Sequence, residues 1–392
     1  MEQDYCELND GLSPEGAPSS GEPNEANQKY LSNFLGSLHF WRGFLRFFGR
    51  LTLLLLETVL LLAVALYGVM YVLAKGPSPT ARDLFVMSVR ETSAVGFLAD
   101  LFFTEEEIAA IEGSDTEEAY DEVDTSLITI VTPTEADSED SAGPVADVWG
   151  YVDEDGDGII IQTVHGEGFT GYMMIVLDPS RVIMGSVPDA FGKQGYTVEQ
   201  MVKYYDAVAG INAGGFVDPE GQGDGSIPST MLVFDGKVYY APCGVRHGFV
   251  GFDSNHIMHV GMFEEEDVIA RDIQYGVSFG PVLIVNGEAV DNSKLSSGIN
   301  PRTAIGQRSD GAVLMLVVDG RQASTLGCTW QDLADIFLEF GAVNACNLDG
   351  GSSTLMWYDG DYVNNCASVI GIRPVPTTFL VLKEGGQIHV EG

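Results

Sequence analysis

Basic residues are scarce in this chain. Only 19 Lys and Arg residues stand against 57 Asp and Glu residues, giving a formal net charge of -38 over 392 residues. A protein that binds nucleic acid needs a basic face to neutralise phosphates, so this composition argues against nucleic acid as a partner. Residues 91–157 contain no Lys or Arg at all. An anionic substrate must therefore be met by local cationic groups and not by the field of the whole protein.

Cysteine is also rare, and its spacing is uninformative for metals. The five cysteines include no CxxC pair, which argues against a zinc ribbon or a thioredoxin motif. Cys6 lies in the N-terminal tail, and the other four residues allow at most two disulfides. We interpret those four as free, buried thiols, because cysteine packs as a small hydrophobe. They are Cys243, Cys328, Cys346 and Cys366.

A serine hydrolase is the natural alternative for a chain with HGEG at residues 165–168 and several serines. The chain lacks a GxSxG nucleophile elbow. The histidines that a catalytic triad would need lie away from the distinctive motifs described below. These histidines are His165, His247, His256 and His259. The sequence therefore argues against a Ser-His-Asp mechanism.

One long apolar run is present. Residues 51–74 carry a single charge, Glu57, and as a helix would extend about 36 Å at about 1.5 Å per residue. The run is too long and too far from the N-terminus for a cleaved signal peptide. A buried core helix is the alternative, but the run is too uniformly apolar to favour it. We predict a single membrane-spanning helix.

Charges around this run predict its orientation. Arg42, Arg46 and Arg50 precede it, whereas Lys75 and Arg82 follow more sparsely. Positive charge concentrates on the cytoplasmic side of membrane helices. We therefore predict a single-pass protein of the cell membrane with a cytoplasmic N-terminus and an extracellular C-terminal part.

Composition divides the rest of the chain. Residues 1–33 are predicted to be a disordered cytoplasmic tail, and residues 34–75 an interfacial segment followed by the membrane helix. Apolar spacing predicts a helical juxtamembrane stalk at 76–112, with Thr104 and Glu107 as a capping box. Residues 113–147 are acidic and predicted to be a linker, and residues 148–392 form the large domain.

The large domain reads as short strands joined by tight turns. Apolar runs such as GYMMIVL, VLIVNG and AVLMLVV alternate with Asp-Gly and Asn-Gly pairs, which favour hairpins. Helices are predicted at 196–210, capped by Thr197, and at 328–341, capped by Thr329 and ended by Gly341. The predicted class is α+β, with mixed, largely antiparallel sheets and flanking helices.

The stretch NLDGGSST, residues 347–354, follows the apolar run AVNACNL. The runs at 312–318 and 342–348 flank the helix predicted at 328–341, so the two strands are expected to be parallel in one sheet. Asp319 and Asp349 would then leave the sheet at the same edge, where crossover folds place ligands. Gly350 and Gly351 would leave amides free for an anion.

Two further motifs carry candidate ligands for an anion. NPRTAIG, residues 300–306, places Arg302 at the entrance of a strand, which suits capture of a phosphate or carboxylate. GINAGGF, residues 210–216, places Asn212 before a glycine pair. Each motif alone is also compatible with a surface ion pair or an ordinary turn.

Taken in order, INAGGF, GPVLIVNGE, NPRTAIG, LVVDGRQ, the NLDGGSST stretch and RPVPTTFLVL resemble the phosphodiester glycosidase domain family over residues 165–383. The helix entry departs from the family at Cys328, where relatives commonly carry an apolar residue. The resemblance implies hydrolysis of a sugar-1-phosphodiester of the N-acetylglucosamine type in surface glycans or glycopolymers, as in exopolysaccharide-related bacterial members. The family motifs map Asn212, Arg302, Asp319, Arg321, Asp349, Ser352, Ser353 and Arg373 onto the pocket. Of these we predict Asp349, Asp319 and Arg302 as catalytic residues. The predicted substrate-binding residues are Asn212, Gly214, Gly215, Arg321, Gly350, Gly351, Ser352, Ser353, Thr354 and Arg373.

The chemistry leaves several alternatives open. Phosphate is already a fair leaving group, so Asp349 is expected to act as acid/base or nucleophile, with Asp319 second and Arg302 on the phosphate. Whether the reaction retains or inverts depends on a carboxylate separation that the sequence does not give. A non-catalytic module that binds cell-wall or exopolysaccharide glycans is the alternative function.

A metal is not required by this chemistry, although calcium would suit carboxylates such as Asp349 and Asp319. DEDGDG, residues 153–158, resembles the start of a calcium loop. Its twelfth position is Val164 where a bidentate Glu is needed, so we interpret it as an acidic turn leading into a strand.

Overall fold

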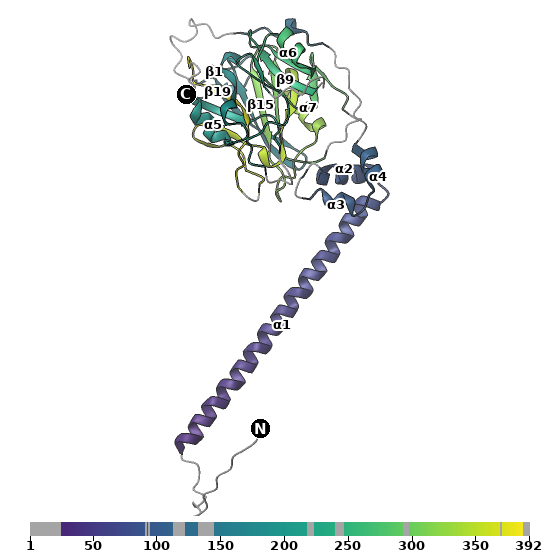
Figure 1. The fold of residues 1–392 in the computed structure, drawn as a ribbon, viewed down its shortest axis with the longest axis vertical. Helices are drawn as coiled ribbons and strands as arrows, with labels where there is room; N and C mark the ends of the chain where they lie inside the picture. The colour runs from purple at the N-terminus through teal and green to yellow at the C-terminus, as the bar shows by residue number, and fades with distance from the viewer. Residues whose placement is uncertain are drawn as a thin grey trace, which may run out of the picture. The chain divides into compact units, whose positions relative to one another are not determined.

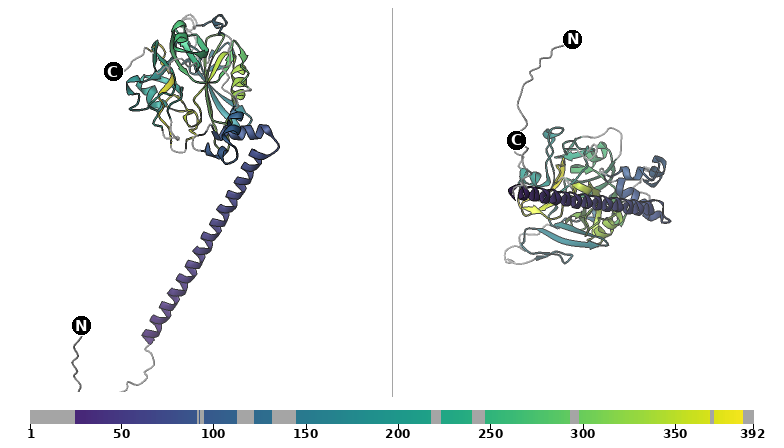
Figure 2. Two further views of the ribbon diagram at one scale, coloured as in Figure 1. Left: turned by 45° about the vertical axis from the view of Figure 1, so that its right-hand side comes forward. Right: turned by 90° about the horizontal axis from the view of Figure 1, so that it is seen from below.

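The computed structural model describes residues 25–90, 92, 95–112, 122–131, 145–217, 223–239, 247–292, 298–368 and 371–386. The chain divides into two compact units, residues 1–70 and 71–392. The elements can be followed in Figure 1 and from two further directions in Figure 2.

A single long helix, α1 (Glu25–Lys75), contains the apolar run. Within the described residues, Phe44–Lys75 is the one stretch long and apolar enough to span a membrane. The helix begins at Glu25, so residues 25–33 are helical and not part of a disordered tail. Residues 34–50 continue into the apolar run as one helix and do not form a separate interfacial segment. No proline interrupts residues 25–75, and an established helix propagates readily.

The juxtamembrane segment is helical, as predicted. It contains α2 (Pro79–Arg90), α3 (Phe97–Asp100) and α4 (Glu105–Glu112). The predicted capping box is present, because the Glu107 amide donates to the Thr104 hydroxyl at 3.3 Å while the Thr104 amide donates to the Glu107 carboxylate at 2.9 Å. The Lys75 ammonium lies 4.2 Å from the Phe103 ring centre, which joins the end of α1 to this segment.

Three antiparallel sheets build the large domain, and their strand pairings confirm the α+β class. A seven-stranded sheet has the order β13-β12-β16-β14-β15-β4-β3, and the two five-stranded sheets have the orders β10-β9-β11-β7-β8 and β18-β17-β6-β19-β5. A separate pair is formed by β1 and β2. The strands are β1 (Val145–Ala146), β2 (Val152–Asp153), β3 (Ile159–Gly166), β4 (Phe169–Val176), β5 (Val182–Ser186), β6 (Ala207–Asn212), β7 (Leu232–Phe234), β8 (Lys237–Tyr239), β9 (His247–Asp253), β10 (Met258–Phe263), β11 (Ile273–Ser278), β12 (Val282–Val285), β13 (Glu288–Ala289), β14 (Arg302–Arg308), β15 (Val313–Val318), β16 (Ala342–Leu348), β17 (Met356–Tyr358), β18 (Asp361–Tyr362) and β19 (Thr377–Leu382).

The predicted hairpin turns are present. Asp235, Asn286 and Asp359 have positive φ angles of 50°, 54° and 47°, and each is followed by a glycine that is also in the left-handed region. Two consecutive positive φ values define the turn that matches the twist of antiparallel strands. These turns join β7 to β8, β12 to β13, and β17 to β18.

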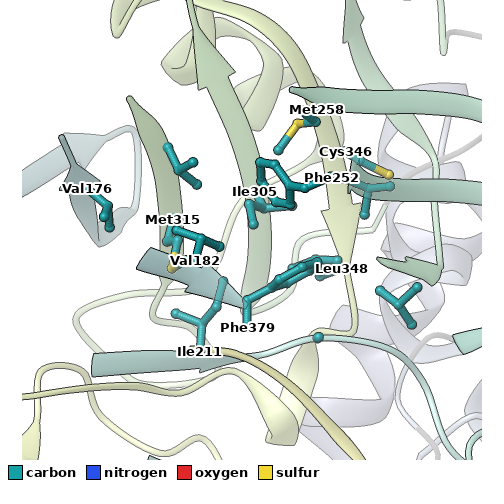
Figure 3. Close-up of a cluster of buried hydrophobic side chains, with 14 of the residues drawn as sticks. Val176, Val182, Ile211, Phe252, Met258, Ile305, Met315, Cys346, Leu348 and Phe379 are labelled. Carbon is teal, nitrogen blue, oxygen red and sulfur yellow. The ribbon is translucent and has the colours of Figure 1, made fainter. Parts of the chain in front are cut away.

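The main hydrophobic core is enclosed by the three larger sheets. Figure 3 shows Ile211 and Phe379 from one five-stranded sheet, Phe252 from the other and Ile305 from the seven-stranded sheet converging on this core. Three helices cover the outer faces of the sheets. They are α5 (Val198–Tyr204), α6 (Glu265–Ala270) and α7 (Trp330–Glu339). Each helix buries one apolar face, so the sheets are packed on both sides.

Both predicted helices of the large domain form, but one is shorter than expected. Thr329 caps α7 and Gly341, with φ of 78°, ends it, as predicted. Thr197 caps α5, but that helix stops at Tyr204, and residues 207–210 belong to β6. The prediction of a helix to residue 210 was therefore wrong. Asp206 adopts a φ of 50°, and Ala209 and Ile211 then enter the main core as strand residues.

Part of the predicted acidic linker is attached to the domain. Asp124 caps a short 3-10 helix, Thr125–Leu127, and Ile128 is buried. The amides of Thr129 and Val131 donate to the carbonyls of Ser309 and Asp310. Residues 125–131 carry no charge, which allows this stretch to pack where its acidic neighbours in the sequence would not. Residues 145–147 of the predicted linker also belong to the domain, because Val145 and Ala146 form β1. Residues 113–121 and 132–144 lie outside the described part of the chain, as does the tail before Glu25.

Candidate functional site

The strand register gathers the sequence motifs at one edge of the domain. β14 pairs antiparallel with both β15 and β16, so those two strands run parallel with β14 between them. Arg302 lies opposite Val318, and Thr303 lies opposite Leu348. The start of β14 therefore lies beside the ends of β15 and β16. Asp319 and Asp349 leave the same edge, as the sequence predicted.

The turn after β16 is held by main-chain bonds to two other elements. The Asp349 amide donates to the Ala213 carbonyl at 2.9 Å, and the Gly351 amide donates to the Pro301 carbonyl at 2.8 Å. A Cβ on Gly350 would lie 2.7 Å from the same Pro301 carbonyl oxygen. The expectation that the amides of both glycines are free for an anion was therefore wrong for Gly351. Gly350 is needed because two backbones pass closely.

Asn212 is fully buried beneath this turn. Its side-chain amide donates to the Asp349 carbonyl at 2.5 Å, and its Oδ1 accepts from the Thr303 hydroxyl at 2.8 Å and the Leu355 amide at 3.1 Å. These bonds join β6, β14 and β16 below Asp349. In this structure Asn212 fixes the position of the Asp349 turn through its backbone.

Arg302 is buried at the start of β14. Its Nε donates to the Cys328 carbonyl at 3.3 Å, and its Nη2 donates to the Gly298 carbonyl at 2.7 Å. The guanidinium also lies 5.4 Å from the Trp330 ring centre. The side chain thus brings a permanent positive charge to the edge of the sheet and connects it to the loop at 298–300.

Two further arginines flank the turn after Gly350. Arg321 is exposed and has a φ of 56°, a conformation that is uncommon outside glycine and concentrates at functional sites. Its Nη1 and Nη2 lie 3.3 Å from the position of a Cβ on Gly351. Arg373 donates to the Ser352 hydroxyl at 3.2 Å and to the Gly223 carbonyl at 3.1 Å. The turn therefore contacts two guanidinium groups.

Asp319 is almost fully buried and accepts three hydrogen bonds. Its Oδ1 accepts from the Asn364 side chain at 3.1 Å and the Asn365 amide at 3.0 Å, and its Oδ2 accepts from the Asn365 side chain at 3.0 Å. Asn364 also donates to the Thr354 carbonyl at 3.1 Å. Sequence analysis missed both asparagines, although an Asn pair directly after the β17–β18 hairpin was a visible signal for a polar turn.

The remaining predicted residues lie around this edge. A Cβ on Gly214 would lie 2.3 Å from Val277, so this glycine serves close packing, whereas Gly215 lies against Phe279 and Ser229. Ser352 and Ser353 belong to a 3-10 turn, Gly351–Ser353. The Thr354 hydroxyl is buried without a hydrogen-bond partner among the described residues. Asp319, Arg302, Arg321 and Arg373 thus lie near the Asp349 turn, whereas Gly214 and Gly215 pack against Val277, Phe279 and Ser229. The chemical roles of all these residues stay predictions.

Among the described residues, none of the hydrogen bonds given above for this cluster involves a cysteine or histidine side chain. Cys328 and Cys346 are free and buried, as predicted, and burial raises the pKa of both thiols. Cys243 lies outside the described residues. His259 pairs with Asp253 at 3.2 Å, beside the Gln307 end of β14. That end is about 16 Å from Arg302 at about 3.3 Å per strand residue, so this pair and the site serines form no triad.

The acidic turn at 153–158 lies elsewhere. The carboxylate oxygens of Asp153, Asp155 and Asp157 lie within 4.8 Å of one another. Asp153 accepts from the amides of Gly156 and Gly158 in its own loop. Asp157 accepts from the Tyr358 hydroxyl at the end of β17, whereas the candidate site lies at the start of that strand. This turn is therefore separate from the candidate site.

Comparison with known proteins agrees with the motifs at this edge. Residues 205–382 match the model of the phosphodiester glycosidase family. These residues are therefore similar to a phosphodiester glycosidase domain. The resemblance predicted from the sequence is confirmed over this range, which contains all the candidate site residues.

Two curated relatives share this part of the chain. The SPbeta prophage-derived uncharacterized protein YomE of Bacillus subtilis is 31% identical over 192 residues, covering 46% of this chain and 29% of the relative. The mouse N-acetylglucosamine-1-phosphodiester alpha-N-acetylglucosaminidase is 24% identical over 217 residues, covering 50% of this chain and 41% of the relative. The chain thus spans less than half the length of either protein.

A solved structure resembles the glycosidase domain more loosely. It is the catalytic domain of the zebrafish N-acetylglucosamine-1-phosphodiester alpha-N-acetylglucosaminidase, auto-inhibited by its pro-peptide. The match has a TM-score of 0.49 and 20% identity, and covers 62% of this chain and 85% of the zebrafish chain.

Proposed function

We propose that this protein hydrolyses a sugar-1-phosphodiester of the N-acetylglucosamine type in surface glycans or glycopolymers. One observation carries the proposal. The carboxylate residue Asp349 directly precedes the turn at 350–353, and the side chains of Arg321 and Arg373 contact this turn. The family match over residues 205–382 supports it. In this proposal the arginines bind the charged phosphodiester, and Asp349 acts at the sugar carbon.

The phosphate is assigned to the two flanking arginines. Arg321 is exposed and lies next to Gly351, and Arg373 contacts the same turn through the Ser352 hydroxyl. A guanidinium presents paired donors that suit phosphate oxygens. Arg302 donates two of its N–H groups to backbone carbonyls, so we assign it a supporting role, in which its buried charge makes the edge favourable for an anion.

Asp349 is assigned to the sugar. In the proposed reaction the bond between the anomeric carbon and the phosphate oxygen breaks, and its electron pair leaves on the phosphate. Water supplies the hydroxyl at the anomeric carbon, and its proton is released or taken up by Asp349. Asp349 acts as base or nucleophile, the two roles that carboxylates take in glycoside hydrolysis. Asp319, held by three hydrogen bonds, positions the turn at Asn364 and Asn365.

We propose that α1 anchors the enzyme in the cell membrane with its N-terminus in the cytoplasm. The apolar stretch Phe44–Lys75 supports a membrane helix. Arg42, Arg46 and Arg50 come before or at the start of its most apolar part, which favours a cytoplasmic N-terminus. The glycosidase domain would then meet glycans outside the cytoplasm.

The proposed activity is tested with the full chain in detergent. A methyl phosphodiester of N-acetylglucosamine 1-phosphate and UDP-N-acetylglucosamine serve as substrates, and free sugar is measured. The methyl glycoside without phosphate is the control, and we expect release only from the phosphodiesters. Binding of the phosphodiester without release of sugar would contradict the hydrolase and identify a glycan-binding module.

Metal removal is expected to leave the activity unchanged. The proposed phosphate site uses guanidinium groups, and the acidic turn at 153–158 lies apart from it. Sugar release with EDTA should therefore remain within about twofold of the untreated rate, since no metal is needed to hold the phosphate. A loss that added calcium restores would show that a metal participates.

A further inference from the structure

The juxtamembrane helix α2 contacts the loop that leads into Arg302. The Ser88 hydroxyl accepts a hydrogen bond from the Ile299 amide at 2.9 Å. A Cβ on Gly298 would lie 2.5 Å from the Ser88 backbone nitrogen, so the loop backbone lies directly on the helix. The Gly298 carbonyl in turn accepts from Arg302 at 2.7 Å. The end of α2 therefore contacts a loop that is itself hydrogen-bonded to Arg302 of the candidate site.

Thr92, just beyond α2, contacts the candidate site itself. Its hydroxyl donates to the Ser88 carbonyl at 2.9 Å and accepts from Nη2 of Arg321 at 2.7 Å. The same Nη2 donates to Asn300 Oδ1 at 3.0 Å. A single hydroxyl thus links the juxtamembrane helix to the exposed arginine that lies against Gly351.

An exposed arginine has considerable rotamer freedom, and fixing it for a ligand costs side-chain entropy. Bonds that hold the guanidinium before the ligand arrives reduce this cost. Thr92 and Asn300 hold Arg321 from one side, and the guanidinium remains next to the turn at Gly351. The arrangement fits pre-organisation of a phosphate ligand.

We propose that Thr92 is a positioning residue that orients Arg321 for the phosphate, so that the juxtamembrane segment completes the site of the glycosidase domain. This inference rests on the proposed function for the identity of the ligand. It extends the site beyond residues 205–382, to a part of the chain that the family match does not include.

The test compares Thr92→Val with Thr92→Ser. Valine has nearly the shape of threonine but lacks the hydroxyl, whereas serine keeps it. Thr80→Val, at an exposed position in the first turn of α2, is the matched control. We expect Thr92→Val to raise KM about 5- to 20-fold with kcat changed less than about twofold, because the variant loses a hydrogen bond to the charged Arg321 side chain. Thr92→Ser and Thr80→Val should stay within about twofold of the wild type.

Calorimetric binding of N-acetylglucosamine 1-phosphate to the full chain in detergent separates this inference from the proposed function. If the wild type binds the sugar phosphate but releases no sugar from the phosphodiesters, the proposed hydrolase fails, while a weakened affinity in Thr92→Val alone still supports the positioning role. Unchanged binding in Thr92→Val would overturn the inference, and so would tighter binding, since Thr92 would then compete with the phosphate for Arg321. A Thr92→Val protein with a lowered Tm and equal losses in KM and kcat would place Thr92 in the fold and overturn it. A wild type that neither binds nor releases sugar would overturn both proposals.

Discussion

Replacing Asp349 by asparagine is expected to lower sugar release at least about 100-fold, because the variant keeps the shape of the side chain but cannot act as base or nucleophile. The fold should tolerate the change. The Asp349 amide and carbonyl bond to Ala213 and Asn212 through the backbone, and neither bond depends on the carboxylate. The loss is expected mainly in kcat, with KM for the phosphodiester retained. Steady-state kinetics with the methyl phosphodiester measure both kcat and KM.

Two variants make this result interpretable. Glu339→Gln, at an exposed position at the end of α7, controls for the loss of one negative charge and should stay within about twofold of the wild type. Asp319→Asn weakens the contacts to Asn364 and Asn365 and is expected to cost less than Asp349→Asn. Full activity in Asp349→Asn together with an inactive Asp319→Asn would move the chemistry to Asp319.

Replacing Arg308 by methionine is expected to destabilise the domain by about 3–5 kcal/mol, the usual cost of removing one partner from a buried ion pair. Arg308 has no exposed surface and bonds to Asp147 at 2.8 Å and Asp310 at 2.6 Å. Its guanidinium also lies 5.5 Å from the Trp149 ring centre. Methionine occupies a similar volume but leaves two carboxylates without this cation.

Thermal unfolding followed by tryptophan fluorescence checks the effect. The matched control is Arg271→Met, because Arg271 is partly exposed and pairs with Asp267 at 3.2 Å. Such a pair contributes less than about 1 kcal/mol, so its Tm should change little. If the Tm of Arg308→Met is as high as that of Arg271→Met, the buried ion pairs add no net stability over an apolar side chain. Some buried ion pairs in proteins behave in this way.

Neighbouring residues in the sequence were sufficient to predict several features. The cap at Thr329, the stop at Gly341 and the Asp-Gly and Asn-Gly hairpins each depend on a few adjacent residues, and all formed as predicted. The apolar run at 51–74 likewise predicted a helix from its own composition. A local sequence pattern does not predict the secondary structure when the same residues could form either a helix or a strand. Residues 207–210 were apolar and followed a capped helix, and only their burial against β17 and β19 made them a strand.

Residues far apart in the sequence decided the arrangement of the site. The sequence alone predicted an acidic chain with one apolar helix, with Asp319 and Asp349 leaving the same sheet edge and Arg302 at the entrance of a strand. The tertiary structure decided that Gly350 faces Pro301, that Asn364 and Asn365 hold Asp319, and that Thr92 bonds to Arg321. Each of these contacts joins segments that come together only when the strands pair and the juxtamembrane helix packs on the domain. A linear pattern shows which residues can form such bonds, but the partner is selected by packing.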